Sequence, residues 1–204
     1  MLDAMSSPQT DTRERILREA WRLMEEKRGE GVRMSDIAKA AGISRQALYL
    51  YFRSRAELLI ATTHYLDQVR GLEERLRQGQ QAVTGVESFE TYLEIWGNYI
   101  PEVYGLSKAL LSARETDPDA AAAWDDRTRM LRENSRKVIN CLLRDGMLAS
   151  GWSPQAASDL LWALMSVQTW ENLTVECGWS HEEYVQRMKA LLKQVLVRSP
   201  KEDV

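Results

Sequence analysis

The stretch D-I-A-K-A-A-G-I-S-R-Q-A-L-Y-L-Y-F, residues 36–52, decides the fold of this chain. Two short helical patterns flank Gly42, because glycine can take the left-handed backbone conformation that a tight turn needs. Ser44 can cap the second helix, since its hydroxyl can accept a hydrogen bond from a free backbone N–H group. Leu48 and Phe52, four residues apart, lie on one face and can pack against the first helix. This spacing predicts a helix-turn-helix, in which the second helix enters the major groove of DNA.

The outward face of the second helix carries side chains that can read DNA. Arginine can bind guanine or a phosphate, glutamine can pair with adenine, and apolar side chains can contact the methyl group of thymine. Tyr49 and Tyr51 can donate hydrogen bonds to phosphate, or they can pack as half-buried structural residues. The groove-facing candidates are Arg45, Gln46, Ala47, Tyr49 and Leu50.

The overall charge hides a local basic segment. The formal net charge is −3, yet residues 42–56 contain three arginines and no acidic residue. A basic patch on an otherwise acidic body suits a protein that meets a polyanion at one end only. An ordinary solvated charged face is the alternative interpretation of the same residues.

Apolar residues recur at helical spacing along the whole chain, and only five prolines interrupt them. We therefore expect an all-α protein. The helix over 55–80 should run unbroken from the first domain into the second, and Pro101 should break or kink its helix. Helices are expected over 11–27, 34–41, 44–52, 55–80, 87–99, 102–115, 119–149, 154–177 and 181–197.

Several classes of protein are excluded by composition. The two cysteines, Cys141 and Cys177, lack the paired spacing of zinc or redox sites, and the start MLDAMSSPQTD lacks an apolar signal segment. No uninterrupted apolar run approaches the ~20 residues that a membrane helix requires. We expect a cytoplasmic protein that neither spans nor contacts a membrane.

Catalytic constellations are absent from the sequence. The glycine-rich phosphate loops, the G-x-S-x-G elbow and the H-E-x-x-H motif do not occur, and His64 and His181 are the only histidines. We expect no enzyme activity, no metal site and no cofactor. A helical interaction or small-molecule-binding protein without sequence-specific DNA binding is the alternative, but it would leave the basic, tyrosine-bearing segment without a purpose.

Residues 12–61 resemble the amino-terminal domain of the tetracycline repressor (TetR) family. The resemblance is carried by R-E-R-I-L-R-E-A-W, by residues 36–52 and by R-S-R-A-E-L-L, and the tail Y-x-Y-F-x-S-R-x-E-L is shared with few other families. It implies that Arg55 approaches the DNA backbone. Arg33 stands where the family usually has threonine; arginine cannot cap a helix but can still reach a phosphate. The DNA-binding set is Arg33, Ser35, Ser44, Arg45, Gln46, Ala47, Tyr49, Leu50, Tyr51 and Arg55.

The same resemblance implies two domains. A DNA-binding domain is expected over 10–70, with its helix-turn-helix at about 33–52, and a ligand-binding and dimerisation domain over 71–200. The motif D-P-D-A-A-A-A-W-D-D-R, residues 117–127, is similar to part of the family. The resemblance implies a homodimeric repressor that binds a palindromic operator and is released by a small molecule.

Aromatic residues predict the ligand pocket. Six of the seven tryptophans follow residue 95, a density that favours a cavity for a small apolar or aromatic effector. Ordinary packing in the core or at a dimer interface is the alternative for each of them. The candidate pocket residues are Trp96, Tyr99, Tyr104, Arg114, Trp124, Asn134, Gln168 and Trp170.

Overall fold

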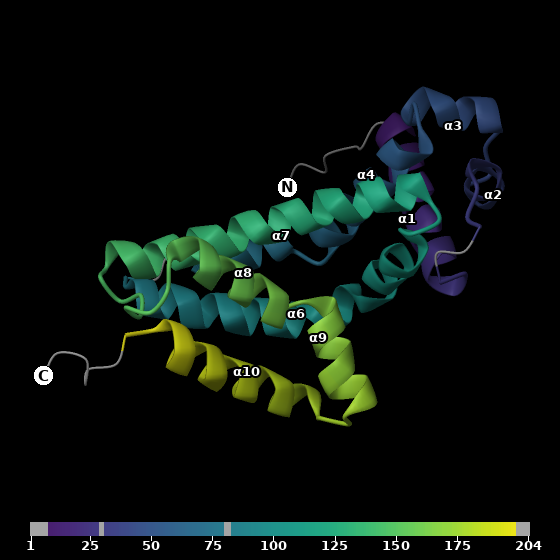
Figure 1. Cartoon of the computed structure of the whole chain (residues 1–204). Helices are drawn as coiled ribbons and strands as arrows, with labels where there is room; N and C mark the ends of the chain where they lie inside the picture. The colour runs from purple at the N-terminus through teal and green to yellow at the C-terminus, as the bar shows by residue number, and fades with distance from the viewer. Residues whose placement is uncertain (1–7, 29–30, 80–82, 199–204) are drawn as a thin grey trace, which may run out of the picture. The chain divides into compact units, whose positions relative to one another are not determined.

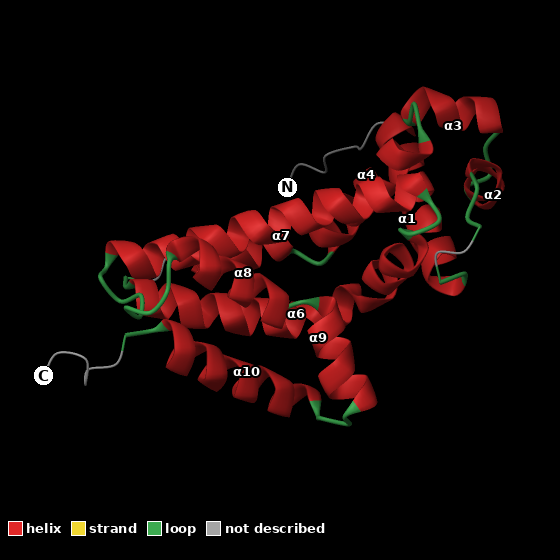
Figure 2. Ribbon diagram, viewed as in Figure 1, coloured by secondary structure: helices red, strands yellow, loops and turns green. Residues whose placement is uncertain are grey.

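The structure, a computed structural model, describes residues 8–28, 31–79 and 83–198. Within these ranges the chain forms helices joined by loops, and no strand is present (Figures 1 and 2). The extended backbone in the described ranges includes an isolated antiparallel bridge between Leu148 and Val197. The all-α prediction is confirmed. Residues 199 and 200, the end of the predicted second domain, lie outside the described residues.

The chain divides into two compact units that do not follow its order. The first unit contains the chain up to Arg70 together with Val103–Arg127, and the second contains Gly71–Glu102 together with the chain from Thr128 onward. Helices α6 (Gly85–Ala113) and α7 (Pro118–Arg144) therefore contribute residues to both units. One edge of the first unit lies at Arg70, and Val103–Arg127 comes from the range 71–200, which the sequence predicts to be the second domain.

Four helices begin the first unit, and the ends of the first three lie close to the predicted ones. They are α1 (Pro8–Glu26), α2 (Met34–Ala40), α3 (Arg45–Tyr51) and α4 (Arg55–Val69). Each presents an apolar face that is removed from water, and this burial is the main force that holds short helices together. Fully buried members of this core are Ile16, Leu17, Ile37, Leu48, Leu58, Leu59, Leu66, Val103, Ala109, Leu110 and Ala123.

The predicted single helix over 55–80 is wrong. Helix α4 ends at Val69, the N–H of Arg70 donates to the carbonyl of Leu66, and Gly71 has a φ of 66°. A left-handed residue ends a helix, and glycine takes this conformation without a steric penalty. A separate helix, α5 (Leu72–Gly79), follows.

The predicted break at Pro101 is also wrong, because α6 continues through this residue from Gly85 to Ala113. Proline removes one N–H group from the helix and crowds the carbonyl four residues earlier, but the rest of a long buried helix can retain it. The division between the two units falls directly after this position, between Glu102 and Val103.

The last predicted helices are divided more finely than expected. The range 154–177 contains α8 (Pro154–Leu164), α9 (Val167–Glu171) and a π-helical segment (Asn172–Glu176). Ser166 starts α9, since its hydroxyl accepts a hydrogen bond from the N–H of Thr169 at 3.1 Å. Helix α10 (His181–Leu196) agrees with its prediction.

Candidate nucleic-acid interface and effector cavity

Helix α3 is built as the sequence predicts for a recognition helix. Gly42, with a φ of 66°, forms the turn before it, and the Ser44 hydroxyl accepts a hydrogen bond from the N–H of Ala47 at 3.0 Å. Leu48 and Phe52 are 0% and 1% exposed. One face of α3 is therefore fixed in the core, and this fixes which side chains point outward.

The outward face of α3 is exposed and carries no acidic residue. Leu50 is 87% exposed and Tyr49 is 40% exposed. The Arg45 guanidinium lies 5.7 Å from the centre of the Tyr49 ring, a contact that holds both side chains on one surface. Gln46 is also exposed, while Ala47 and Tyr51 are half-buried. Hydrogen-bond donors, an amide and an apolar tip are thus available together to base edges.

Several residues that are predicted to contact the DNA backbone line a groove beside α3. Its volume is about 530 Å³, and its rim includes the exposed side chains of Arg33 and Ser35 from the start of α2. Arg45 and Tyr49 of α3 line the same groove. Cationic and hydroxyl side chains on one concave surface are suited to phosphate oxygens.

Arg33 begins α2 without capping it through its side chain, as expected for an arginine at this position. Asp36 supplies the reciprocal half of the cap, because its carboxylate accepts a hydrogen bond from the Arg33 N–H at 3.3 Å. That backbone hydrogen bond and the nearby Lys27 ammonium lower the pKa of Asp36. The Arg33 guanidinium therefore remains on the exposed side of the turn.

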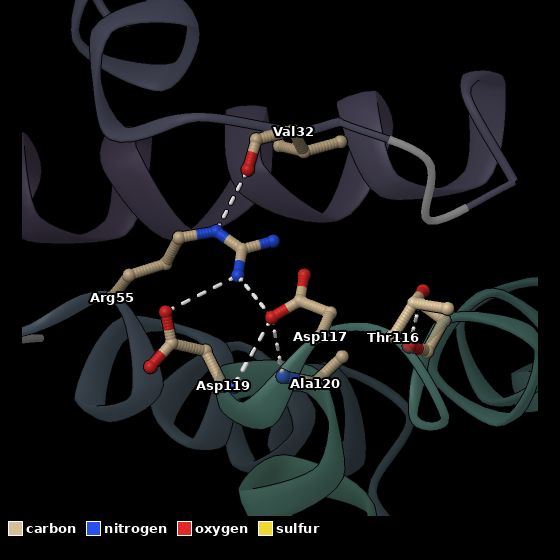
Figure 3. A network of polar contacts seen from close by, with 7 residues as sticks. Val32, Arg55, Thr116, Asp117, Asp119 and Ala120 are labelled. Carbon is tan, nitrogen blue, oxygen red and sulfur yellow. Dashed lines mark hydrogen bonds and ion pairs between the residues drawn. The ribbon is translucent and has the colours of Figure 1, made fainter.

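Arg55 departs from the expectation of a side chain directed at DNA. Figure 3 shows its guanidinium between two parts of the first unit: Nε donates to the carbonyl of Val32 at 2.7 Å, and Nη1 donates to Asp117 Oδ1 at 2.8 Å. Nη1 also lies 3.3 Å from Asp119 Oδ2, and the side chain is only 16% exposed. The guanidinium links Val32, two residues before α2, to the turn before α7.

The carboxylate of Asp117 is itself held in a network (Figure 3). Its Oδ1 accepts hydrogen bonds from the N–H groups of Asp119 at 3.1 Å and Ala120 at 3.2 Å. Burial alone would raise the pKa of Asp117, but the hydrogen bonds from Arg55 and from these backbone groups outweigh it and lower the pKa. The group is therefore an anion at neutral pH.

The eight predicted pocket residues do not form one set. Tyr104, Arg114 and Trp124 belong to the first unit, where the Arg114 guanidinium lies 5.9 Å from the Trp124 ring centre. The other five belong to the second unit, where Trp96 is 2% exposed and its indole N–H donates to the carbonyl of Met165 at 2.8 Å. Trp96 and Tyr99 contact each other at a centroid distance of 5.5 Å.

A cavity of about 80 Å³ lies in the second unit, and Asn134 is the one predicted pocket residue that lines it. Its walls come from α5, α6 and α7. Pocket candidates were chosen from the tryptophan-rich segments of the sequence, so the other residues that line the cavity were missed. The lining residues of α6 and of α7 nevertheless recur at helical spacing. The lining residues are Leu76, Ser88, Tyr92, Ile95, Asn134, Lys137, Val138 and Cys141.

Two further features are absent from residues 8–28, 31–79 and 83–198. None of the helices there is long and apolar enough to cross a membrane. Among the same residues, no group of three or more His, Cys, Asp or Glu side chains is placed to hold a metal ion.

Comparisons with known proteins agree with the geometry of α3. The sequence model of the family described as "Bacterial regulatory proteins, tetR family" matches residues 16–62. The HTH-type transcriptional regulator CymR of Pseudomonas putida is 24% identical over 182 residues, which cover 85% of this chain and 82% of the relative.

Solved structures with a similar fold cover nearly the whole chain. A regulator from Saccharomonospora viridis in complex with choline has a TM-score of 0.73 at 18% identity and covers 94% of this chain and 100% of its own. Native NalD, the secondary repressor of the MexAB-OprM multidrug efflux pump in Pseudomonas aeruginosa, has a TM-score of 0.67 at 21% identity, with coverages of 93% and 98%.

The fold and α3 together define a DNA-binding regulator of the helix-turn-helix class. Residues 16–62 match the TetR family of bacterial regulatory proteins, and the chain is similar over most of its length to transcriptional regulators of this fold.

Proposed function

We propose that this regulator is a homodimeric repressor that binds a palindromic operator through α3 and that a small, largely apolar effector releases it. The observation that carries the proposal is the outward face of α3, where Arg45, Gln46, Tyr49 and Leu50 are exposed beside a fixed apolar face. This arrangement presents base-reading groups on a helix whose orientation the core determines.

The size of α3 supports the dimer. The helix has seven residues, so one copy can contact only a few base pairs. Two symmetric copies about 34–36 Å apart would read two half-sites one helical turn apart and so give a more selective address. A repressor that occupies a promoter in this way acts where the DNA is, so we place the protein in the cytoplasm.

The cavity in the second unit supports control by an effector. Similar proteins include one solved with choline, so small molecules bind within this fold. An effector can shift the equilibrium between DNA-binding and released forms only by its different affinities for the two forms. A coupling of about 1–3 kcal/mol, which is typical, would weaken operator binding roughly 5- to 150-fold.

Selection of bound duplexes from a random library tests the proposal. We expect a palindromic consensus, and Arg45→Ala or Tyr49→Ala should weaken binding to it by about 1–3 kcal/mol without loss of helical circular dichroism. Arg136→Ala serves as the control, because Arg136 is exposed and lies in the second unit. Enrichment of no sequence in a salt-controlled selection would contradict the proposal and favour a helical binding protein without sequence-specific DNA recognition.

A further inference from the structure

The cavity in the second unit carries one sign of charge. Lys137 lines it, and none of its eight lining residues is acidic. Neither Lys137 nor Asn134 makes a side-chain hydrogen bond or ion pair with another described residue. An ammonium and an amide are therefore available to a ligand in the cavity, and both can donate hydrogen bonds.

The remaining walls are suited to a small apolar body. Leu76, Ile95 and Val138 are aliphatic, and Tyr92 presents its ring, because its buried hydroxyl lies 3.4 Å from the hydroxyl of Ser135. The volume of about 80 Å³ is small. An apolar cavity of about 150 Å³ holds one benzene molecule, so a cavity of about half that volume takes a short aliphatic chain, and a ring enters only if the walls move apart.

We infer that the effector is a small apolar monocarboxylic acid, whose carboxylate is bound by Lys137 and Asn134 and whose body lies among Leu76, Ile95 and Val138. This inference rests on the proposed function, because it names the class of the effector. A cation such as choline would meet an ammonium and no carboxylate in this cavity, so its binding would be opposed. A charge-assisted hydrogen bond favours the acid over its neutral amide by about ten- to a hundredfold.

Matched acids and amides test the charge requirement. The probes are phenylacetate, benzoate, hexanoate and octanoate, each beside its amide, together with choline. Two readouts are used on the full chain: the melting temperature of the free protein and the release of a fluorescent operator obtained by selection. We expect at least one acid to raise the melting temperature and to release the operator, while its amide requires about ten- to a hundredfold higher concentration.

Variants assign the effect to Lys137. Lys137→Met should remove the preference for the acid over the amide, and Lys137→Arg should retain it. Arg136→Met is the matched control, because it removes a neighbouring exposed cation of α7 that does not line the cavity. The inference is overturned if no acid of the panel shifts melting, if acid and amide act equally, or if Lys137→Met retains the preference. Failure of operator selection with acid-dependent melting intact would instead reject the proposed function alone.

A different observation, in the first unit, carries a second inference. Arg55 lines the groove beside α3 together with Arg33, Ser35 and Arg45, yet two carboxylates already contact its guanidinium. Asp117 lines the groove as well. Two carboxylates and one guanidinium give this cluster a net negative charge. The resemblance to the TetR family implies a DNA phosphate at this same place.

We propose that Asp117 and Asp119 compete with a DNA phosphate for Arg55 and thereby act as positioning residues that lower the affinity for DNA. Arg55 can bind the backbone only after its Nη1 exchanges a carboxylate for a phosphate oxygen. Asp117→Asn should therefore tighten binding to specific and nonspecific duplexes alike, by about three- to tenfold, and steepen the salt dependence by about 0.9 because one more phosphate is neutralised.

The variant should fold, since asparagine caps helices as well as aspartate does and can still accept the hydrogen bond from Ala120. Asp119→Asn should act in the same direction with a smaller effect, because its contact is longer. Asp125→Asn, an exposed site of the same helix, is the control for the loss of one negative charge. Arg55→Ala should abolish the gain of Asp117→Asn. Unchanged or weakened DNA binding by Asp117→Asn would overturn the proposal and assign the carboxylate to holding Arg55 in its binding position.

Discussion

At the scale of single residues, the most demanding feature is a buried ion pair. Arg127 is 3% exposed, and its Nη1 lies 3.1 Å from Asp67 Oδ1 and 3.2 Å from Asp67 Oδ2. Both residues belong to the first unit and come from α7 and α4. Two charges removed from water are tolerated only while they are paired, because the desolvation of each is expensive.

We expect Asp67→Ala to lower the free energy of unfolding by about 3–5 kcal/mol, since it leaves a guanidinium in the core without this carboxylate. Urea unfolding followed by circular dichroism measures the change. The double variant Asp67→Ala/Arg127→Met should recover much of the loss, because no charge is then buried. A double variant as unstable as the single one would show that packing, and not charge, determines the effect.

Burial also sets the titration of Tyr92. Loss of contact with water raises its pKa to about 12, against an ordinary value of 10.0, although the hydrogen bond with Ser135 opposes the shift. A raised pKa stabilises the folded state below pH 10 and loses this contribution as the pH rises through 12. We expect Tyr92 to be among the tyrosines that ionise late in an absorbance titration, and stability to fall between pH 10 and 12.

Tyr92→Phe identifies that tyrosine. In the variant the amplitude of the late phase should fall by one tyrosine, and stability should depend less on pH above 10 because the ionising group is gone. An unchanged amplitude would assign the late phase to other buried tyrosines. Tyr184 is the suitable comparison, since its burial raises its pKa as well.

At the scale of elements, the break between α4 and α5 depends on one residue. We expect Gly71→Ala to destabilise the protein by about 1–2 kcal/mol, because alanine at a φ of 66° is strained. Thermal unfolding measures the loss. Had the helix continued through this position, alanine would stabilise it, so the sign of the change decides between the two arrangements. Gly151→Ala is the control, because Gly151 has open space around it and no positive φ.

Elements that depend on residues close together in the sequence could be predicted from spacing and residue type. Gly42, Ser44, Leu48 and Phe52 lie within eleven residues of one another, so spacing alone predicts the turn, the cap and the buried face. Gly71 was missed because apolar spacing continues on both sides of it, and glycine inside a helical pattern does not by itself show a positive φ. The helix break expected at Pro101 did not occur, because the local penalty was outweighed by the packing of a long helix.

The candidate sites show the same limit. The exposed face of α3 follows from periodicity, but the contacts of Arg55 with Asp117 and Asp119 join residues more than sixty positions apart. Lys137 gave no signal in the sequence because an exposed lysine of a helix is ordinary, and only the cavity beside it makes it a candidate. Long-range neighbours of this kind are set by tertiary packing, which propensity and spacing do not encode.

At the scale of the whole molecule, the proposed dimer needs a surface that the core does not already use. Much of the apolar face of α10 is buried within the chain, including Tyr184, Met188 and Leu192. Leu191 of the same helix is 44% exposed and remains available to a partner. An isologous interface repeats each contact twice, so one substitution changes both halves.

We expect Leu191→Glu to convert the dimer to a monomer at micromolar concentration, because a carboxylate in an apolar interface would be buried twice without a partner. Sedimentation velocity measures the mass, and operator affinity should fall in parallel. Gln186→Glu adds the same charge at another exposed site of α10 and should leave the mass unchanged. A Leu191→Glu protein that still sediments as a dimer would place the interface elsewhere.

The discontinuous composition of the first unit limits how this regulator can be re-engineered as a biosensor. A segment cut at Arg70 would retain α3 but would lack Val103–Arg127, which supplies Leu106, Leu110 and Trp124 to the same compact unit. A chimaera that joins residues 1–70 to a foreign sensing domain would therefore expose an apolar surface unless its graft also transplants this second segment. The DNA-binding unit of this protein can be transferred only as two segments of chain, and the second segment contains parts of α6 and α7.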